Sequence, residues 1–117
     1  MKTVRNKLLL IILLLCLVGL PVSAQTGKFY STNNELSSSL INQIFQDERG
    51  FIWIATEYGL NKFDGLRFSN YKHISGDSTS IKNNYVRTLF EDNGRNLLVG
   101  CIDGLMRYNS ETDSFRE

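Results

Sequence analysis

The sequence is poor in the residues that most often carry catalysis or bind metals. Its 117 residues include one His, one Trp, one Pro and two Cys. No group of side chains has metal-ligand spacing, no nucleophile has a base at catalytic spacing, and no glycine-rich phosphate loop occurs. We therefore expect no catalytic residue, no metal and no cofactor in this chain.

The net charge and the number of cysteines are also low enough to exclude whole classes of protein. Lys and Arg number 13 against 12 Asp and Glu, so no general attraction to nucleic acid or anionic lipid is expected. Cys16 follows three leucines, whereas a lipoprotein cleavage site has a small residue directly before its cysteine. Cys101 would then be the one cysteine of a processed chain, which excludes an internal disulfide. Its apolar neighbours predict a buried, unreactive thiol.

The longest apolar run is too short to cross a membrane. It covers 13 residues, 8–20, whereas a helix needs roughly 20 to span ~30 Å of hydrocarbon. Basic residues precede this run, and a proline and three small residues, 22–24, follow it. The arrangement predicts a signal peptide over residues 1–24, cleaved between Ala24 and Gln25, and hence an exported protein. An uncleaved membrane anchor is the alternative.

The rest of the chain repeats itself at an interval of 45 residues. Without a gap, residues 40–47 align with 85–92, and residues 52–56 align with 97–101. Elsewhere in the repeat apolar residues align with apolar residues, and turn residues with turn residues, which indicates a true internal repeat. Within residues 40–64, the pairs that are identical at this interval are Phe45/Phe90, Asp47/Asp92, Gly59/Gly104 and Leu60/Leu105.

Each copy of the repeat is predicted to form four short strands separated by turns. Polar or glycine-containing segments at 47–50 and 64–65 supply turn signals, and the nearly continuous apolar run 51–56 predicts a strand buried on both faces. Four antiparallel strands in 45 residues is the period of a β-propeller blade. The predicted strands cover residues 41–46, 51–56, 60–63 and 68–71 in the first copy, and 86–91, 97–101, 105–108 and a segment starting near 115 in the second.

The predicted fold is therefore all-β, an incomplete propeller of about two blades after a signal peptide. Residues 25–39 are assigned to an N-terminal lead-in, 40–84 to the first blade and 85–117 to a truncated second blade. A polar loop over 73–84 is expected to separate the blades. A small sandwich or barrel is the competing all-β fold.

Residues 47–65 carry a motif that can be compared with known repeats. They read D-x-x-G-F-I-W-I-A-T-x-x-G-L-N-K-F-D-G, after L-S-S-S-L-I at 36–41. This motif resembles the two-component regulator propeller repeat, which occurs in tandem in the periplasmic sensor regions of hybrid two-component histidine kinases. The second copy has Leu98 for Trp, Cys101 for Thr and Asn109-Ser110 for Asp-Gly. The matching positions are Asp47, Gly50, Trp53, Thr56, Gly59, Leu60, Asp64 and Gly65 in the first copy, and Asp92, Gly104 and Leu105 in the second.

The resemblance implies the N-terminal piece of a periplasmic ligand sensor whose parent protein lies in the inner membrane. The implied parent senses an oligosaccharide and regulates transcription through a histidine kinase, of which these residues contain no part. The chain itself is therefore not expected to be an enzyme, and His73, in the polar loop, is not expected to accept a phosphoryl group. Implied partners are the remaining blades and an oligosaccharide ligand. Nucleic acid is not expected as a partner. Contact with the membrane is expected only through an uncleaved signal peptide or through the missing C-terminal part of the parent protein.

Several residues allow both a structural and a functional interpretation. Trp53 could stack on a sugar, but its apolar flanks favour a core position between blades. Asp47 and Asp92 could be catalytic carboxylates, but equivalent turn positions favour bonds to their own backbone. The candidates for surface recognition are Tyr58, Arg67, Tyr71 and Lys72.

Two other functions remain open at this stage: an exported propeller hydrolase or lyase acting on polysaccharides, and a free-standing secreted binding protein that assembles from several copies. A propeller ring usually closes with four to eight blades, so two blades leave both outer faces uncovered. We expect those faces to expose apolar residues of the kind seen at Phe51, Trp53, Leu98 and Val99. The isolated chain is expected to be molten, aggregated or self-associated.

Overall fold

The computed structural model describes residues 2–17, 26–32 and 35–117. Helix α1, Lys2–Leu17, contains most of the N-terminal apolar run, and the side chains of Val4 and of residues 8–15 are exposed. In the part of the chain that the structure describes, no helix is long and apolar enough to cross a membrane. The predicted cleavage between Ala24 and Gln25 falls outside the described residues.

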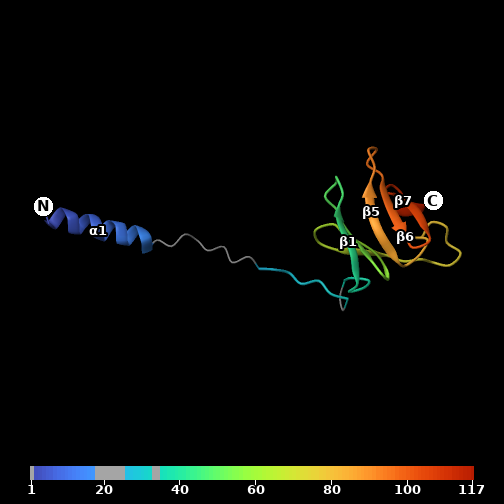
Figure 1. The fold of residues 1–117 in the computed structure, drawn as a ribbon, viewed down its shortest axis with the longest axis horizontal. Coiled ribbons are helices and arrows are strands. Elements are labelled where there is room, and N and C mark those ends of the chain that lie inside the picture. Colours follow the sequence, from blue (N-terminus) through green and yellow to red (C-terminus); the bar gives the residue numbers. More distant parts are fainter. Residues whose placement is uncertain (1, 18–25, 33–34) are drawn as a thin grey trace.

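The repeat forms two four-stranded antiparallel sheets, as predicted (Figure 1). In each sheet, strands that follow one another in the sequence are hydrogen-bonded neighbours. Strand β5 of the second sheet lies against β1 and β2 of the first. The first sheet contains β1 (Ile41–Gln46), β2 (Ile52–Thr56), β3 (Gly59–Phe63) and β4 (Phe68–Tyr71), and the second contains β5 (Val86–Glu91), β6 (Leu97–Cys101), β7 (Gly104–Asn109) and β8 (Ser114–Arg116).

An aspartate organises the first turn of each sheet. Asp47 Oδ1 accepts hydrogen bonds from the backbone N–H groups of Arg49 (3.0 Å) and Phe51 (2.9 Å). Asp92 Oδ1 does the same for Gly94 and Asn96, at 2.9 Å each. Both aspartates therefore hold turns together, as their equivalent positions suggested.

The β2–β3 turn explains two further motif positions, Thr56 and Gly59. Thr56 Oγ1 donates to the carbonyl oxygen of Gly59 at 2.7 Å, and Gly59 has φ +129°. A Cβ atom at Gly59 would lie 2.9 Å from the Tyr71 carbonyl oxygen. A side chain at this position would therefore both strain the backbone and collide with β4.

The hydrophobic core lies between the two sheets. Strand alternation directs Trp53, Ala55 and Leu60 of the first sheet towards the second, and their partners come mainly from one face of the second sheet. Contributors from the second half of the chain are Ile81, Val86, Leu89, Leu97, Val99, Cys101, Met106, Tyr108 and Phe115.

Two expectations about exposure were wrong. Trp53 and Val99 are not exposed on outer faces; both are 0% exposed, because they lie on the two faces that meet. The segment 73–84 is not simply a polar loop, because Ile81 within it is also fully buried and belongs to the core. Phe51 and Leu98 are partly exposed.

The second sheet departs from the 45-residue spacing at its last turn. Phe63 pairs with Phe68 across the β3–β4 turn, whereas Tyr108 pairs with Phe115 across the β7–β8 turn. The later turn is therefore two residues longer. It contains Asp113, a non-glycine residue with φ +50°.

Candidate functional site

The residues that the structure describes contain no group of three or more His, Cys, Asp or Glu side chains that could hold a metal ion. Burial raises the pKa of the Cys101 thiol, the predicted buried cysteine, and so disfavours the nucleophilic thiolate. The features with functional potential are therefore the junction between the sheets and the exposed surface around it.

Side-chain amides connect β1 and β5, the first strands of the two sheets. Gln43 Nε2 donates to the Leu89 carbonyl oxygen at 3.1 Å, and Gln43 Oε1 accepts from the Leu89 N–H at 2.8 Å. Asn42 Nδ2 donates to the Val86 carbonyl oxygen at 2.8 Å. Strand β5 has an irregularity between Val86 and Thr88, and these bonds satisfy backbone groups beside it.

Lys62 crosses the junction from the first sheet to the second. Its Nζ donates to Tyr108 Oη at 3.0 Å. The same ammonium lies 4.4 Å from the ring centroid of Phe51, 5.4 Å from that of Trp53 and 5.2 Å from that of Tyr108. A cation held over aromatic faces on both sheets stabilises their contact through cation–π attraction.

Asp113 accepts hydrogen bonds from tyrosines of both sheets. Tyr71 Oη donates to Asp113 Oδ1 at 2.7 Å, and Tyr108 Oη donates to the same oxygen at 2.6 Å. Partial burial opposes ionisation, but these hydrogen bonds and the charge of Lys62 hold the pKa of Asp113 below its usual value. Burial and the bond to Asp113 raise the pKa of Tyr71 and that of Tyr108.

Trp53 has no face available for a sugar. Its indole Nε1–H donates to Asp47 Oδ2 at 2.8 Å. Its ring meets Tyr108 edge-on, with centroids 4.8 Å apart, and stacks on Tyr71 at 5.9 Å. Because the side chain is fully buried, the core interpretation describes it and the stacking-platform interpretation does not.

The structure separates the four residues proposed for surface recognition. Tyr58 is 54% exposed, and Lys72 Nζ lies 4.0 Å from its ring centroid, so these two form an exposed pair. Arg67 is exposed but lies in the β3–β4 turn, at the other end of β3. Tyr71 was wrongly placed in this group, because it is half-buried and bonded to Asp113.

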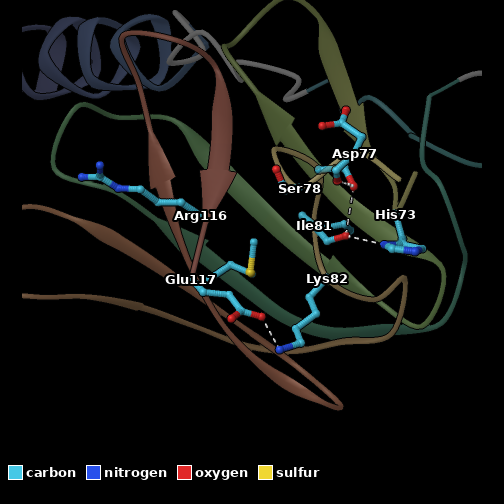
Figure 2. A pocket seen from close by; sticks show the side chains of 9 residues that line it. His73, Asp77, Ser78, Ile81, Lys82, Arg116 and Glu117 are labelled. Carbon is cyan, nitrogen blue, oxygen red and sulfur yellow. Dashed lines mark hydrogen bonds and ion pairs between the residues drawn. The ribbon is translucent and has the colours of Figure 1, made fainter. Parts of the chain in front are cut away.

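A hollow of about 510 Å³ opens between the 73–84 segment and the end of the second sheet (Figure 2). The Lys82 ammonium and the Glu117 carboxylate form an ion pair at its edge. His73 Nδ1 is bonded to the Ile81 carbonyl oxygen at 2.9 Å, and the Arg116 side chain points away from the ion pair. These paired groups leave the hollow without a free cluster for acid–base chemistry.

A second hollow, of about 270 Å³, is lined by four arginines, which sequence reasoning missed. Arg49 comes from the β1–β2 turn, Arg95 from the β5–β6 turn, and Arg107 and Arg116 from β7 and β8. Arg95 is paired with Glu48 at 2.7 Å. Residues so far apart in the sequence give no local signal, although the register of β7 and β8 places Arg107 directly opposite Arg116.

Comparison with known proteins agrees with this geometry. Residues 35–58 match the family described as "Two component regulator propeller". A 74-residue stretch is 36% identical to histidine kinase P4 of Formosa agariphila; it covers 60% of this chain and 5% of that protein. The fold is similar to the extracellular domain of BT3049 from B. thetaiotaomicron, which is assigned to the hybrid two-component systems. That comparison has a TM-score of 0.65 at 37% identity, and covers 75% of this chain and 12% of the solved one.

Proposed function

We propose that this chain, which carries two-component regulator propeller repeats, forms the first two blades of the extracellular sensing region of a hybrid two-component histidine kinase. One observation carries the proposal: two stacked four-stranded sheets that resemble such an extracellular domain with a TM-score of 0.65 at 37% identity. The chain spans only 12% of that domain and 5% of the curated kinase. The activity of the whole protein is therefore part of the proposal.

The ligand proposed for the parent protein is an oligosaccharide, and its binding is proposed to change transcription. The exposed pair of Tyr58 and Lys72 supports a role for this chain in contacting such a ligand. A tyrosine ring offers an apolar face and a polar edge, and an ammonium is a hydrogen-bond donor for hydroxyl groups. The pair lies at the β2–β3 end of the first sheet.

The proposed location of the mature chain is the periplasm, after removal of residues 1–24. Mass spectrometry of the exported protein should find Gln25 at the N-terminus, either free or cyclised. The sequence pattern that supports this is the basic start, the short apolar run and the small residues at 22–24. An intact Met1 in the membrane fraction would instead make the segment an anchor.

The function is tested by reading the DNA beyond the codon for Glu117 and by expressing the sensing region that it encodes. A continuing frame with further repeats, a membrane helix and a kinase is expected. Calorimetric titration of that region with neutral and acidic oligosaccharides should then give saturable binding, which Tyr58→Ala weakens and Arg67→Ala, in the distant turn, does not. A frame that continues into glycosidase-type carboxylates without a kinase would contradict the proposal.

A further inference from the structure

The hollow lined by four arginines is bordered by turns of both sheets and by the last two strands. Two of the four arginines come from equivalent turns, β1–β2 and β5–β6, and the other two come from β7 and β8. The space has a volume of about 270 Å³, and asparagine and serine side chains add further polar groups to its lining. We call the space lined by Arg49, Arg95, Arg107 and Arg116 the arginine hollow.

Most of the positive charge in the arginine hollow is not neutralised by the protein. Arg95 is paired with Glu48 at 2.7 Å, and Glu111 is the one acidic residue in the lining. No described residue forms an ion pair with any of the other three arginines. Three unpaired arginines against one glutamate leave the hollow with a net charge of +2.

Two of the arginines are held side by side at a cost in stability. Arg107 and Arg116 are direct partners in the β7–β8 register, and like charges opposite each other in a sheet repel. The repeat does not require this arrangement, because the equivalent pair in the first sheet is Lys62 and Ser69. An anion bound between the two guanidinium groups would remove the repulsion.

A third arginine has a backbone conformation that favours glycine. Arg95 has φ +61°, and its equivalent in the first sheet is Gly50, with φ +90°. A non-glycine residue in this region has a conformational penalty, and residues of this kind concentrate at functional sites. The chain therefore has an arginine where glycine would be less strained, and that arginine lines the hollow.

Both turn arginines are attached to a fixed backbone. Arg49 N–H donates to Asp47 Oδ1 at 3.0 Å, and Arg95 N–H donates to the Asp92 carbonyl oxygen at 2.9 Å. Asp92 Oδ1 also accepts bonds from the N–H groups on either side of Arg95. Turns held in this way reduce the conformational entropy that is lost when a ligand binds.

We infer that the arginine hollow binds a tetrahedral oxyanion with two negative charges, either a sulfate or phosphate ion or a phosphate monoester, between guanidinium groups of both sheets. Guanidinium groups bind such oxyanions through paired N–H donors at fixed spacing, and these charge-assisted hydrogen bonds are strong. One dianion neutralises the net charge of the hollow, whereas one carboxylate neutralises half of it.

This site is separate from the surface proposed to contact an oligosaccharide. Arg49 precedes β2 and Tyr58 follows it, so the arginine hollow and the exposed pair of Tyr58 and Lys72 lie at opposite ends of that strand. The inference therefore goes beyond the proposed function and does not rest on it. Because the hollow takes residues from both sheets, a bound anion should also stabilise their contact.

Equilibrium dialysis of the full chain against radiolabelled sulfate tests the site, because it measures the bound anion whatever the oligomeric state. Saturable binding of one sulfate per chain is expected, and unlabelled phosphate should displace it. Arg107→Gln should weaken binding by about tenfold or more, since a charged hydrogen-bond donor is lost. Arg87→Gln is the matched control: it removes the same charge from an exposed residue at the other end of β5, and it should leave the affinity unchanged.

Two further variants separate binding from folding and from charge. Arg95→Gly relieves the left-handed conformation, so it should fold at least as stably as the unmodified chain and still bind sulfate several-fold more weakly. Arg107→Lys keeps the charge but loses the planar pair of donors, so it should also weaken binding several-fold. Sulfate should raise the urea midpoint of the unmodified chain more than that of Arg107→Gln, because only the former gains from binding.

Four results would overturn the inference. Binding that does not saturate would remove the site, and equal weakening by Arg87→Gln and Arg107→Gln would mean that overall charge attracts the anion. Full affinity in Arg107→Lys would exclude recognition by the guanidinium group. Stronger displacement by acetate than by phosphate would make this a carboxylate site.

Competition distinguishes the two sources of the anion. Displacement of sulfate by methyl phosphate at lower concentration than by inorganic phosphate supports an esterified group, and the reverse order supports the free ion. None of these results depends on whether the parent is a kinase sensor, so failure of this site would leave the proposed function standing.

Discussion

At the scale of single residues, Trp53 joins a turn, a strand and the partner sheet. Its ring packs on Tyr71 and Tyr108, and its N–H is held by Asp47. We expect Trp53→Ala to lower the free energy of unfolding by about 3–5 kcal/mol, because a large buried side chain leaves a cavity. Urea denaturation followed by circular dichroism measures this loss.

Trp53→Phe is the matched control for that substitution. It keeps most of the ring but removes the N–H that bonds to Asp47, so it should cost less than the alanine variant. Unchanged stability of both variants, together with loss of ligand response in the whole sensing region, would support a sugar-binding role instead.

A backbone position distinguishes the two blades. Gly50 has φ +90° in the β1–β2 turn, and its equivalent in the β5–β6 turn is Arg95, with φ +61°. An L-residue pays a conformational penalty in this region that glycine avoids. Arg95→Gly should therefore raise the free energy of unfolding by about 0.5–1 kcal/mol. Loss of the exposed Arg95–Glu48 ion pair reduces this gain.

The reverse change provides the comparison for Arg95→Gly. A Cβ at Gly50 meets no neighbouring atom within 4 Å, so the effect of Gly50→Ala contains no steric clash. It reports the backbone strain, less the gain from a lower conformational entropy of the unfolded chain. If Arg95→Gly destabilised the protein as much as Gly50→Ala, the ion pair and not the backbone would control this turn.

At the scale of strands and sheets, the junction should respond to pH at both extremes. Tyr71 and Tyr108 have pKa values raised above about 10, because burial favours their neutral form. Their contribution to the stability of the folded state is therefore complete below pH 10 and is lost as the pH rises further. Asp113 has a pKa lowered from its usual value near 4, so its contribution is present above pH 4 and is lost as the pH falls through its folded value. Thermal melts between pH 2 and 12 should show a plateau between these limits.

Substitutions separate the two limbs of this pH profile. Tyr71→Phe should flatten the alkaline limb, and Asp113→Asn should flatten part of the acid limb. Asp64, Asp77 and Asp92 also have lowered pKa values, because hydrogen bonds to their carboxylates favour the ionised form, and they contribute to the remaining acid sensitivity. An alkaline limb that is identical in Tyr71→Phe and the unmodified chain would contradict this assignment.

The strands could be predicted because their signals are local. Apolar runs and turn residues located all eight strands, and the 45-residue repeat indicated two equivalent sheets. The contacts between the sheets could not be predicted in the same way. Lys62 reaches Tyr108, and Gln43 reaches Leu89, across separations that no periodic pattern encodes. The longer β7–β8 turn, which places Asp113 beside two tyrosines, likewise depends on tertiary structure.

At the scale of the whole molecule, the chain should associate when it is isolated. Phe90 and Leu105 remain exposed on one outer face, and Ile44 is 61% exposed on the other. Exposed apolar patches and unpaired outer strands favour association. Sedimentation of residues 25–117 should show oligomers or aggregates, and Phe90→Lys with Leu105→Lys should shift the distribution towards monomer. A monomer with a sharp cooperative melt would instead indicate that two blades suffice.

The edge-on contact of Trp53 with Tyr108 of the other sheet also has a consequence for the order of events during synthesis. Tyr108 leaves the ribosome 55 residues after Trp53, which at roughly 5–20 residues per second is a delay of about 3–11 s. All hydrogen-bonded strand partners of the first sheet are available well before then, since β4 ends at Tyr71. The nascent chain therefore has an interval in which one sheet can be complete while its tryptophan still faces solvent. During that interval a chaperone has an apolar surface to bind, and a neighbouring nascent chain has a surface on which to misassemble.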